Sequence, residues 1–383
     1  MTAPAASLPR LRVTHVISGL GDGGAEAVLY RVLTSDPGND HAVISLTDAG
    51  RYGPLLQAAG IGVQVLGMRR GRGTFAGWRR LLRLLRASRP DVVQTWMYHA
   101  DLLGGLAARW TGTGAVVWGV HSATLDARAT KVVAAVCALA SHVIPRRIIF
   151  VSREAARLHR GRGYASGRIT VIPNGYDTEA LRPDAAARER LRREWLLPPA
   201  TIALGMVARW DVLKDHANLA AALSRLAGDK AADWKLVLVG QGIDDANVEL
   251  LRLLEGAGVR ERTLLLGSRP DIAAVMSALD LHVLSSRAEA FPNVVAEAMS
   301  CGTPCVVTDV GDAAYIVGET GWVVPPRDPE ALAGALHAAI EAMRDAEGRA
   351  SRQLAARARV ETEFGLAGVV RRYAEVWRAV ASR

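Results

Sequence analysis

The sequence predicts an α/β protein built from two doubly wound parallel-sheet domains. Short apolar segments of strand type alternate with helix-length segments through both halves of the 383-residue chain, which is the pattern of parallel sheets. A turn-rich segment at 173–183, PNGYDTEALRP, separates the two series. We therefore expect one domain over 1–175, completed by a C-terminal helix over 368–383, and a second domain over 176–367.

The first series opens with a strand at 13–18 and a glycine-rich loop. Gly19, Gly21, Gly23 and Gly24 stand between this strand and the next helix. Glycine lets the backbone approach a ligand closely, so the loop suits a phosphate group. The spacing G-x-G-x-G-G is not the usual dinucleotide fingerprint, however, and a tight structural turn is the alternative interpretation.

The rest of the first domain follows as alternating strands and helices. His121 comes directly after one of these strands, at the carboxyl end where open α/β sheets bind ligands, which favours a role in a site. We expect strands at 41–46, 62–66, 91–94, 115–120, 147–151 and 169–172, and helices at 25–33, 52–59, 75–89, 97–110 and 153–160.

The predicted helix at 75–89, FAGWRRLLRLLRASR, is basic and amphipathic. Such a helix suits an anionic membrane surface, or its apolar face packs on the sheet while the arginines remain solvated. The two interpretations are compatible if only the arginines touch lipid. Trp78, Leu81, Leu82 and Leu85 share the apolar face, and Arg79, Arg80, Arg83 and Arg86 lie mainly on the other.

Charge is distributed unevenly along the chain. Residues 1–175 contain 22 Lys and Arg against 9 Asp and Glu, whereas the remainder contains 25 against 29. This asymmetry favours an anionic partner, either phosphate-bearing lipid or nucleic acid. Aromatic content is only 5% and no nucleic-acid recognition motif is present, so a nucleic-acid-binding protein is the remote alternative.

The second series contains a strand–loop–helix–strand segment over 281–309, LHVLSSRAEAFPNVVAEAMSCGTPCVVTD. Pro292 suits a first helical turn, and Gly302 ends the helix expected at 293–300. A helix start attracts phosphate, and a neighbouring carboxylate suits sugar hydroxyls. Glu289 and Glu297 bracket this turn, although a plain buried αβ unit would have the same pattern. Further elements are expected at 185–195, 202–207, 235–239, 262–266 and 368–381.

Several features point to a cytoplasmic location. The three cysteines are few and odd in number, as in a reducing compartment. The N-terminal residues lack the pattern of a signal peptide, and no apolar run reaches the length of a membrane span. CGTPC at 301–305 has no second half elsewhere, so a zinc site is not expected.

These residues resemble the retaining glycosyltransferases of family 4. The most specific match is the E-x7-E pattern of Glu289 and Glu297, and the resemblance covers nearly the whole chain. It implies the GT-B fold, in which two Rossmann-like domains face each other across a cleft, and no metal or other cofactor. Supporting matches, in order, are GLGDGGAE, VIPNGYD, ARWDVLKDH, LVGQG and LLGSRPDI.

The resemblance implies roles for residues that contact the diphosphate and the reacting sugar. Arg209 and Lys214 would contact the donor diphosphate and stabilise the leaving group, a role that suits their charge. Gly23 and Gly24 would close on the diphosphate from the other domain. His121 would face the donor sugar near the reacting carbon.

Further roles concern the nucleoside and the transferred sugar. Glu297 would accept hydrogen bonds from the ribose, and Glu289 would hold hydroxyls of the sugar. Arg269 would line the base, with Gly240 forming the wall beside it. The backbone that binds sugar and phosphate oxygens would come from Phe291, Pro292, Asn293, Val294 and Val295.

Two positions depart from the family pattern. Tyr315, in VGDAAYIVG, stands where glutamate is usual, and Asp215 follows Lys214 where glycine is common. The first departure makes the surroundings of the donor site less certain, whereas the second does not threaten the lysine.

The resemblance implies transfer of a sugar from a nucleotide donor with retained anomeric configuration. No D-x-D metal motif is present, in agreement with a metal-independent reaction. A UDP-sugar is the first expectation for the donor and GDP-mannose the second, and the acceptor would be a glycan or a lipid-linked sugar. Together with the basic first half, this places the protein on the inner face of the cell membrane, as a peripheral enzyme of surface polysaccharide or glycolipid synthesis. A sugar-nucleotide epimerase or hydrolase of the same fold is the alternative.

Overall fold

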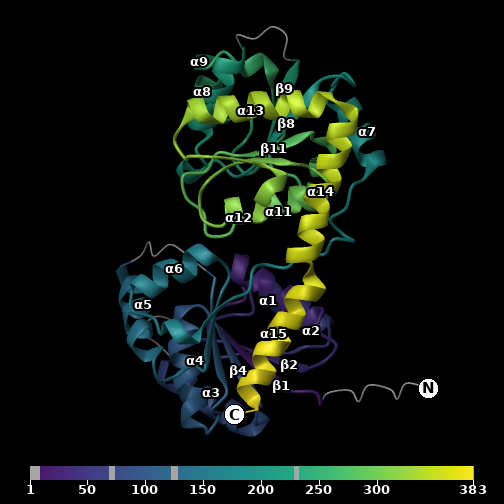
Figure 1. The fold of residues 1–383 in the computed structure, drawn as a ribbon. Coiled ribbons are helices and arrows are strands. Elements are labelled where there is room, and N and C mark those ends of the chain that lie inside the picture. Colours follow the sequence, from purple (N-terminus) through teal and green to yellow (C-terminus); the bar gives the residue numbers. More distant parts are fainter. Residues whose placement is uncertain (1–8, 69–73, 122–127, 228–232, 383) are drawn as a thin grey trace, which may run out of the picture. The chain divides into compact units, whose positions relative to one another are not determined.

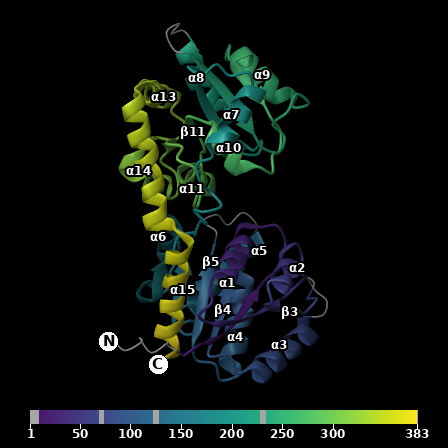
Figure 2. The same ribbon diagram turned by 90° about the vertical axis from the view of Figure 1, so that its right-hand side faces the viewer.

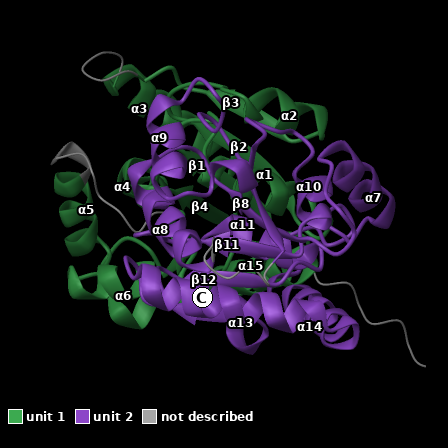
Figure 3. Ribbon diagram, turned by 90° about the horizontal axis from the view of Figure 1, so that it is seen from above, with its two compact units in different colours: residues 1–175, 366–383 green, residues 176–365 purple. Residues whose placement is uncertain are grey.

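The computed structural model describes residues 9–68, 74–121, 128–227 and 233–382 (Figure 1). It divides into two compact units, which Figure 3 colours separately: Met1–Gly175 with Leu366–Arg383, and Tyr176–Gly365. The sequence prediction had its boundaries after residues 175 and 367. Residues 1–8, on which the signal-peptide prediction partly rests, lie outside the described residues.

The first unit contains a seven-stranded parallel sheet in the order β3-β2-β1-β4-β5-β6-β7. β1 pairs with β2 on one side and with β4 on the other, so the strand order reverses beside β1. Loops that follow strands at such a reversal form the usual ligand-binding edge of an α/β sheet. The strands are β1 (Arg12–Ile17), β2 (Asp40–Ser45), β3 (Gly62–Val65), β4 (Val92–Trp96), β5 (Val116–Val120), β6 (Arg147–Phe150) and β7 (Ile169–Val171).

The helices of this unit include the last one of the chain. Trp377, on α15, is fully buried and donates from Nε1 to Oε1 of Gln94 at 3.1 Å, so the C-terminal helix is part of the core of the first unit (Figure 2). The helices are α1 (Gly24–Thr34), α2 (Tyr52–Ala58), α3 (Thr74–Ser88), α4 (Tyr98–Trp110), α5 (Arg128–Ala140), α6 (Arg153–Gly161) and α15 (Leu366–Ala381).

The packing of α3 confirms one of its two sequence interpretations. Leu81, Leu82 and Leu85 are buried, whereas the arginines of the opposite face are exposed. The apolar face therefore packs within the unit because burial of leucine side chains is favourable. The exposed arginines are Arg79, Arg80, Arg83 and Arg86.

The second unit contains a six-stranded parallel sheet in the order β10-β9-β8-β11-β12-β13. Two doubly wound parallel sheets were predicted, and this part of the prediction is confirmed. The edge strand β13 was not among the predicted strands. The strands are β8 (Ile202–Val207), β9 (Trp234–Val239), β10 (Thr263–Leu265), β11 (Leu281–Leu284), β12 (Cys305–Thr308) and β13 (Trp322–Val324).

Helices cover the second sheet. α8, α9 and α13 share one core cluster with the strands, and α10 packs against α7 and α11. In the described part of the chain, no helix is both long and apolar enough to cross a membrane. The helices are α7 (Ala185–Glu194), α8 (His216–Ala227), α9 (Val248–Gly256), α10 (Ile272–Ala278), α11 (Asn293–Ser300), α12 (Ala313–Val317), α13 (Pro329–Arg344) and α14 (Ala346–Phe364).

Candidate active site

The predicted donor residues of the second unit gather at one edge of its sheet. Arg209 follows β8, Gly240 follows β9, Arg269 follows β10 and Glu289 follows β11. These four strands are parallel and adjacent in the order β10-β9-β8-β11. Their carboxyl-terminal loops are therefore neighbours, at the edge where open α/β sheets bind ligands.

Lys214 and Glu289 form an ion pair at the centre of this edge. The lysine Nζ lies 2.6 Å from Oε1 of the glutamate, and the two side chains are 19% and 14% exposed. Oε1 also accepts a hydrogen bond from Ser286 Oγ at 2.8 Å. Since both contacts use Oε1, the second carboxylate oxygen, Oε2, makes no hydrogen bond within the described part of the chain. Lys214, predicted to contact the diphosphate, is thus in direct contact with Glu289, predicted to hold the sugar.

Additional contacts hold the loop after β8 against the loop after β11. Ser285 Oγ donates to the carbonyl of Lys214 at 3.0 Å and to that of Asp215 at 3.1 Å. The backbone N–H of Arg287 donates to the carbonyl of Leu213 at 2.7 Å. The backbone carbonyls of Lys214 and of the residues before and after it are thus all bonded to the loop after β11. These bonds fix the position of Lys214 relative to that loop.

Asp215 explains why the position after the lysine commonly carries glycine. Its φ is +52°, in the left-handed region that glycine and, to a lesser degree, Asp and Asn adopt without severe strain. The carboxylate is buried and forms an ion pair with Arg287, whose Nε lies 2.7 Å from Oδ2. This left-handed conformation is one that glycine adopts without strain, and here it carries a charged side chain that contacts the neighbouring loop.

Arg209 is oriented by a separate carboxylate. Its Nε and Nη2 lie 3.1 and 2.9 Å from Oδ2 of Asp211, and its side chain is 60% exposed. Asp211 also accepts from the backbone N–H of Leu213 at 2.8 Å. That hydrogen bond, followed by the one from Arg209, lowers the pKa of the Asp211 carboxyl. Arg209 thus presents an accessible guanidinium group close in sequence to Lys214.

The helix α11 has the expected bounds, Asn293–Ser300, but Pro292 lies just before its first turn and not in it. Pro292 is the N-cap and Asn293 the first helical residue, so the expected proline in the first turn is wrong by one position. Pro292 has no side-chain group that could cap this helix start, and among the described residues its first backbone N–H groups are suited to an anion. Asn293 accepts at Oδ1 from the hydroxyl of Tyr176 at 2.5 Å, whereas Phe291 is buried against the ring of Phe364.

Val294, Val295 and Glu297 all lie within α11. Val294 is partly exposed in the first turn, and Val295 is buried, with its N–H donating to the carbonyl of Pro292 at 3.1 Å. Glu297 lies one turn inside α11 and is partly exposed. Glu289 and Glu297 therefore stand on either side of an uncapped helix start.

Gly240 and Arg269 differ in how well they fit their predicted roles. Gly240 has φ of +151°, and a Cβ there would lie 2.1 Å from the carbonyl oxygen of Ala208, so only glycine fits beside this loop. Arg269 is already engaged: it forms two hydrogen bonds with Asp271 at 2.8 and 2.6 Å and lies 3.5 Å from Glu194. Because its guanidinium group is bound to these carboxylates, Arg269 is better suited to holding the loop after β10 in place than to binding a ligand.

His121, Gly23 and Gly24 belong to the first unit, where they follow the carboxyl ends of strands. The ring of His121 stacks on Trp96 at 4.9 Å, and both ring nitrogens are buried without a hydrogen-bond partner in the described structure. Burial lowers the pKa of His121 to about 4, so the imidazole is neutral near pH 7. Gly23 is the N-cap of α1, and a Cβ there would meet the carboxylate of Glu26 at 2.3 Å.

Tyr315, the other departure from the family pattern, packs against α14. Its ring lies 5.5 Å from that of Phe364, and the guanidinium carbon of Arg359 is 5.7 Å from its centroid. The hydroxyl donates to Glu363 at 3.5 Å. These three contacts are all with α14, so the tyrosine joins α12 to that helix.

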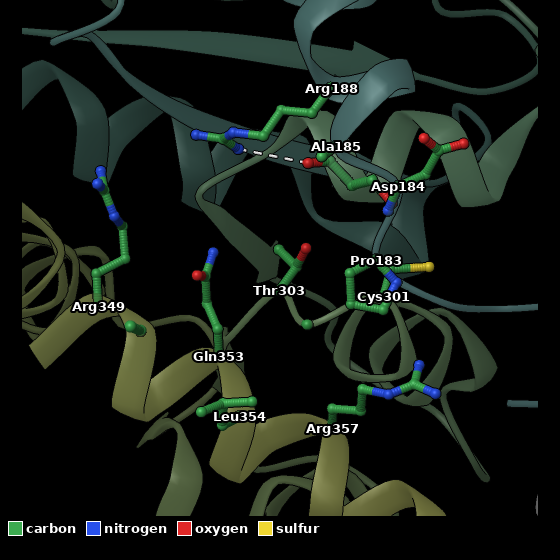
Figure 4. Close-up of a pocket in the computed structure, with 13 residues that line it drawn as sticks. Pro183, Asp184, Ala185, Arg188, Cys301, Thr303, Arg349, Gln353, Leu354 and Arg357 are labelled. Carbon is green, nitrogen blue, oxygen red and sulfur yellow. Dashed lines mark hydrogen bonds between the residues drawn. The ribbon is translucent and has the colours of Figure 1, made fainter. Parts of the chain in front are cut away.

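A cavity of about 510 Å³ lies elsewhere in the second unit (Figure 4). Its lining includes Cys301 and Thr303, at the end of α11 opposite to its uncapped start. None of the predicted site residues lines it. Two of its charged groups already have partners, since Arg188 pairs with Asp280 at 2.5 Å and Arg357 donates to the carbonyl of Ser300 at 2.7 Å. Within the described residues, no three His, Cys, Asp or Glu side chains converge on a point that could hold a metal ion.

Two family descriptions match this chain. Residues 22–180 match Glycosyltransferase Family 4, and residues 201–342 match Glycosyl transferases group 1. A solved structure titled Anabaena Alr3699/HepE in complex with UDP superposes with a TM-score of 0.84 at 22% identity, covering 96% of this chain and 100% of that one. The expected fold is thus confirmed as that of GT-B glycosyltransferases. The chain belongs to the group 1 glycosyltransferases of family 4.

Curated relatives match over shorter stretches. A UDP-Gal:alpha-D-GlcNAc-diphosphoundecaprenol alpha-1,3-galactosyltransferase of Escherichia coli is 29% identical over 269 residues, which are 67% of this chain and 68% of that protein. A D-inositol 3-phosphate glycosyltransferase of Corynebacterium jeikeium (strain K411) is 32% identical over 199 residues, or 49% of this chain. The chain spans about half the length of this second relative, 47%.

The residues that position Lys214 and Glu289 were not predicted from the sequence. Ser285, Ser286 and Arg287 lie between β11 and Glu289, and Asp215 follows Lys214. A signal was present, because a polar Ser-Ser-Arg run between a buried strand and a carboxylate indicates side chains that bind another loop. What the run could not show is that its partner is the loop after β8, about seventy residues earlier in the chain.

Substitution of Asp215 tests whether its backbone conformation or its charge matters more. Asp215→Gly and Asp215→Ala both remove the ion pair with Arg287, so the difference between them reports the backbone alone. Because φ is +52°, Asp215→Ala should lower the free energy of unfolding by about 1–2 kcal/mol more than Asp215→Gly. Urea denaturation followed by circular dichroism measures the difference. Asn, which tolerates this conformation without the charge, is the matched control. If Ala were as stable as Gly, backbone strain at this residue would not be the governing factor.

Proposed function

We propose that this glycosyltransferase moves a sugar from a nucleotide-sugar donor to a glycan or lipid-linked acceptor, with retention of the anomeric configuration. The observation that supports this most is the contact of Lys214 with Glu289 beside the uncapped start of α11. That arrangement offers a cation and helix N–H groups for a diphosphate, and a carboxylate for sugar hydroxyls, at one edge of one sheet.

The reaction would proceed as follows. The bond between the anomeric carbon and the diphosphate oxygen breaks, and negative charge develops on the leaving group. Lys214 and Arg209 stabilise that charge electrostatically. A new bond forms between the anomeric carbon and the acceptor oxygen on the same face of the sugar. The proton of the acceptor hydroxyl passes to an oxygen of the leaving phosphate, so no side chain has to act as a general base.

Glu289 would hold the transferred sugar through Oε2. Its other oxygen, Oε1, is already occupied by Lys214 at 2.6 Å and Ser286 at 2.8 Å. A carboxylate oriented by two hydrogen bonds loses little freedom when it accepts a sugar hydroxyl, which favours binding. His121, neutral near pH 7 and with both ring nitrogens unpartnered in the described structure, would bind a hydroxyl of the sugar from the first unit.

The donor nucleotide is proposed to be a UDP-sugar, with GDP-mannose as the second candidate. The Escherichia coli relative is named for a UDP-galactose donor and a diphosphoundecaprenol-linked acceptor, which supports both a uridine nucleotide and a lipid-linked acceptor. Glu297 would accept from the ribose hydroxyls, and Gly240 would leave room beside the base. Metal independence is part of the proposal, since Lys214 and Arg209 supply the positive charge that a metal ion would otherwise provide.

Transfer assays on single variants test the catalytic assignment. Lys214→Ala and Glu289→Ala should each lower kcat/KM for a UDP-sugar by at least ~100-fold, because Lys214 stabilises the charge of the leaving group and Glu289 positions the transferred sugar. The assay would follow sugar transfer to a polyprenyl-diphosphate-linked acceptor, with the donor chosen by a thermal-shift screen of nucleotide sugars.

Controls separate this function from its alternatives. Arg225→Ala, on an exposed part of α8, should leave transfer unchanged. Nuclear magnetic resonance of the product should show the same anomeric configuration as the donor, and activity should persist in a chelator. Full activity of both Lys214→Ala and Glu289→Ala would contradict the assignment. Conversion of the donor without an acceptor would identify an epimerase or hydrolase instead.

The exposed arginines of α3 support a peripheral membrane location on the inner face of the membrane. Their side chains are solvated while the leucines of the same helix are buried, so contact with anionic lipid requires no rearrangement of the helix. Phe75, at the start of α3, is 74% exposed and adds an apolar group to this basic surface.

Charge reversal on α3 tests the membrane contact. Replacing Arg79, Arg80 and Arg83 together by Glu should weaken binding to phosphatidylglycerol vesicles by at least ~10-fold, because each basic residue near the surface contributes about 1 kcal/mol. Cosedimentation with vesicles measures binding, and vesicles of phosphatidylcholine alone are the control. Unchanged binding of the triple variant would remove α3 from the membrane contact.

A further inference from the structure

A second basic feature of the first unit is a cavity of about 410 Å³ lined by four arginines. Arg109 comes from the end of α4, and Arg168 from the turn before β7. Arg147 is the first residue of β6, and Arg146 directly precedes it. The cavity therefore lies at the amino-terminal edge of the sheet, whereas Gly23 and His121 follow carboxyl ends of strands. It is distinct from the part of this unit that is proposed to contact the donor.

The charges of these arginines are not neutralised by carboxylates. Arg168 donates to the carbonyls of Pro145 at 2.6 Å and Ser141 at 3.2 Å, and Arg146 donates to that of Val380. Arg147 donates to the carbonyl of Arg146 at 3.3 Å. Among the residues that the structure describes, no carboxylate lines the cavity and none of the four arginines forms an ion pair. Like charges gathered without a counter-charge repel each other, which an anion would relieve.

The geometry brings two of the guanidinium groups to the same turn. The position that a Cβ on Gly114 would occupy is 3.1 Å from Nη2 of Arg146 and 3.7 Å from Nη1 of Arg109. Arg109 has no hydrogen bond or ion pair in the described part of the chain, so its donors are available. Planar guanidinium forks of this kind bind phosphate oxygens in pairs, with charge-assisted hydrogen bonds.

The arginines are held in place before any ligand binds. Arg146, Arg147 and Arg168 are partly buried and each donates to a backbone carbonyl. Because these bonds leave other donors of the same groups free, the side chains are oriented yet still able to bind an anion. The cavity is thus better organised than a patch of solvated surface arginines.

Exposed apolar side chains border the cavity. Val143, which lines it, is 69% exposed, and Leu139, one turn earlier at the end of α5, is 79% exposed. Trp110, next to Arg109, is 73% exposed. Such large apolar groups beside a basic cavity are suited to the interface between lipid headgroups and acyl chains.

We propose that this arginine cavity binds a phosphate group carried by another molecule. A lipid headgroup and a soluble phosphate compound share this chemistry, and the experiment has one arm for each. This proposal is tested by binding measurements and does not depend on glycosyl transfer. Phosphate binding in the cavity and the proposed transfer reaction can therefore each fail independently of the other.

The experiment compares the full-length protein with two charge-matched variants. The cavity variant is Arg109→Gln with Arg147→Gln. The control is Arg160→Gln with Arg371→Gln, two exposed arginines of the same unit without an ion pair in the described structure. One arm measures cosedimentation with phosphatidylcholine vesicles that contain phosphatidylglycerol. The other measures titration calorimetry with inorganic phosphate and pyrophosphate. Any contribution from α3 or from the donor site is common to all three proteins.

The cavity variant should bind at least ~10-fold more weakly than the control in one arm, and that arm identifies the source of the phosphate. Arg109→Gln alone should show a smaller loss of binding in the same arm. Because the Arg109 side chain is exposed and has no partner in the described structure, this substitution removes no contact that stabilises the fold. If the cavity variant and the control bound vesicles, phosphate and pyrophosphate equally, the proposal would be overturned.

Discussion

The ion pair of Lys214 and Glu289 is the interaction on which the candidate site depends. It joins the loop after β8 to the loop after β11, two strands that are neighbours only because the strand order reverses at this point of the sheet. The pair is mostly shielded from water, so each charge needs the other when no donor is bound. A donor would therefore enter a site whose cation and carboxylate are already in place, and little reorganisation would accompany binding.

The contacts around this pair show why the site could be predicted only in part. The parallel alternation is a property of the sequence, and it indicated the fold that the structure confirms. The spacing of Glu289 and Glu297 is also visible in the sequence, and it indicated the segment that supplies Glu289 to the candidate site. The ion pair of Glu289 with Lys214 could not be predicted from the sequence, because no local pattern links the two residues. Asp215 was recognised only as a departure from the family, and its φ of +52° supplies the physical reason. Arg269 shows the opposite case, since its carboxylate partners restrict the role that the resemblance implied.

Within the described residues, two features of the first unit gather basic side chains. One is the exposed face of α3, where arginines cover a helix whose leucines are buried. The other is the arginine cavity, where residues from α4, β6 and the turn before β7 converge without a carboxylate. The basic face of α3 could be predicted from the sequence, because its arginines recur with helical periodicity. The second required the fold, since its arginines are spread over about sixty residues of the chain.

A double-mutant cycle on Lys214 and Glu289 tests the central claim most directly. The transfer rate would be measured for Lys214→Gln, Glu289→Gln and the double variant. If the two side chains act as one unit, the double variant should be little worse than either single variant, with a coupling energy of about 1.5–3 kcal/mol. Independent effects, in which the two losses simply multiply, would contradict a site organised around this ion pair.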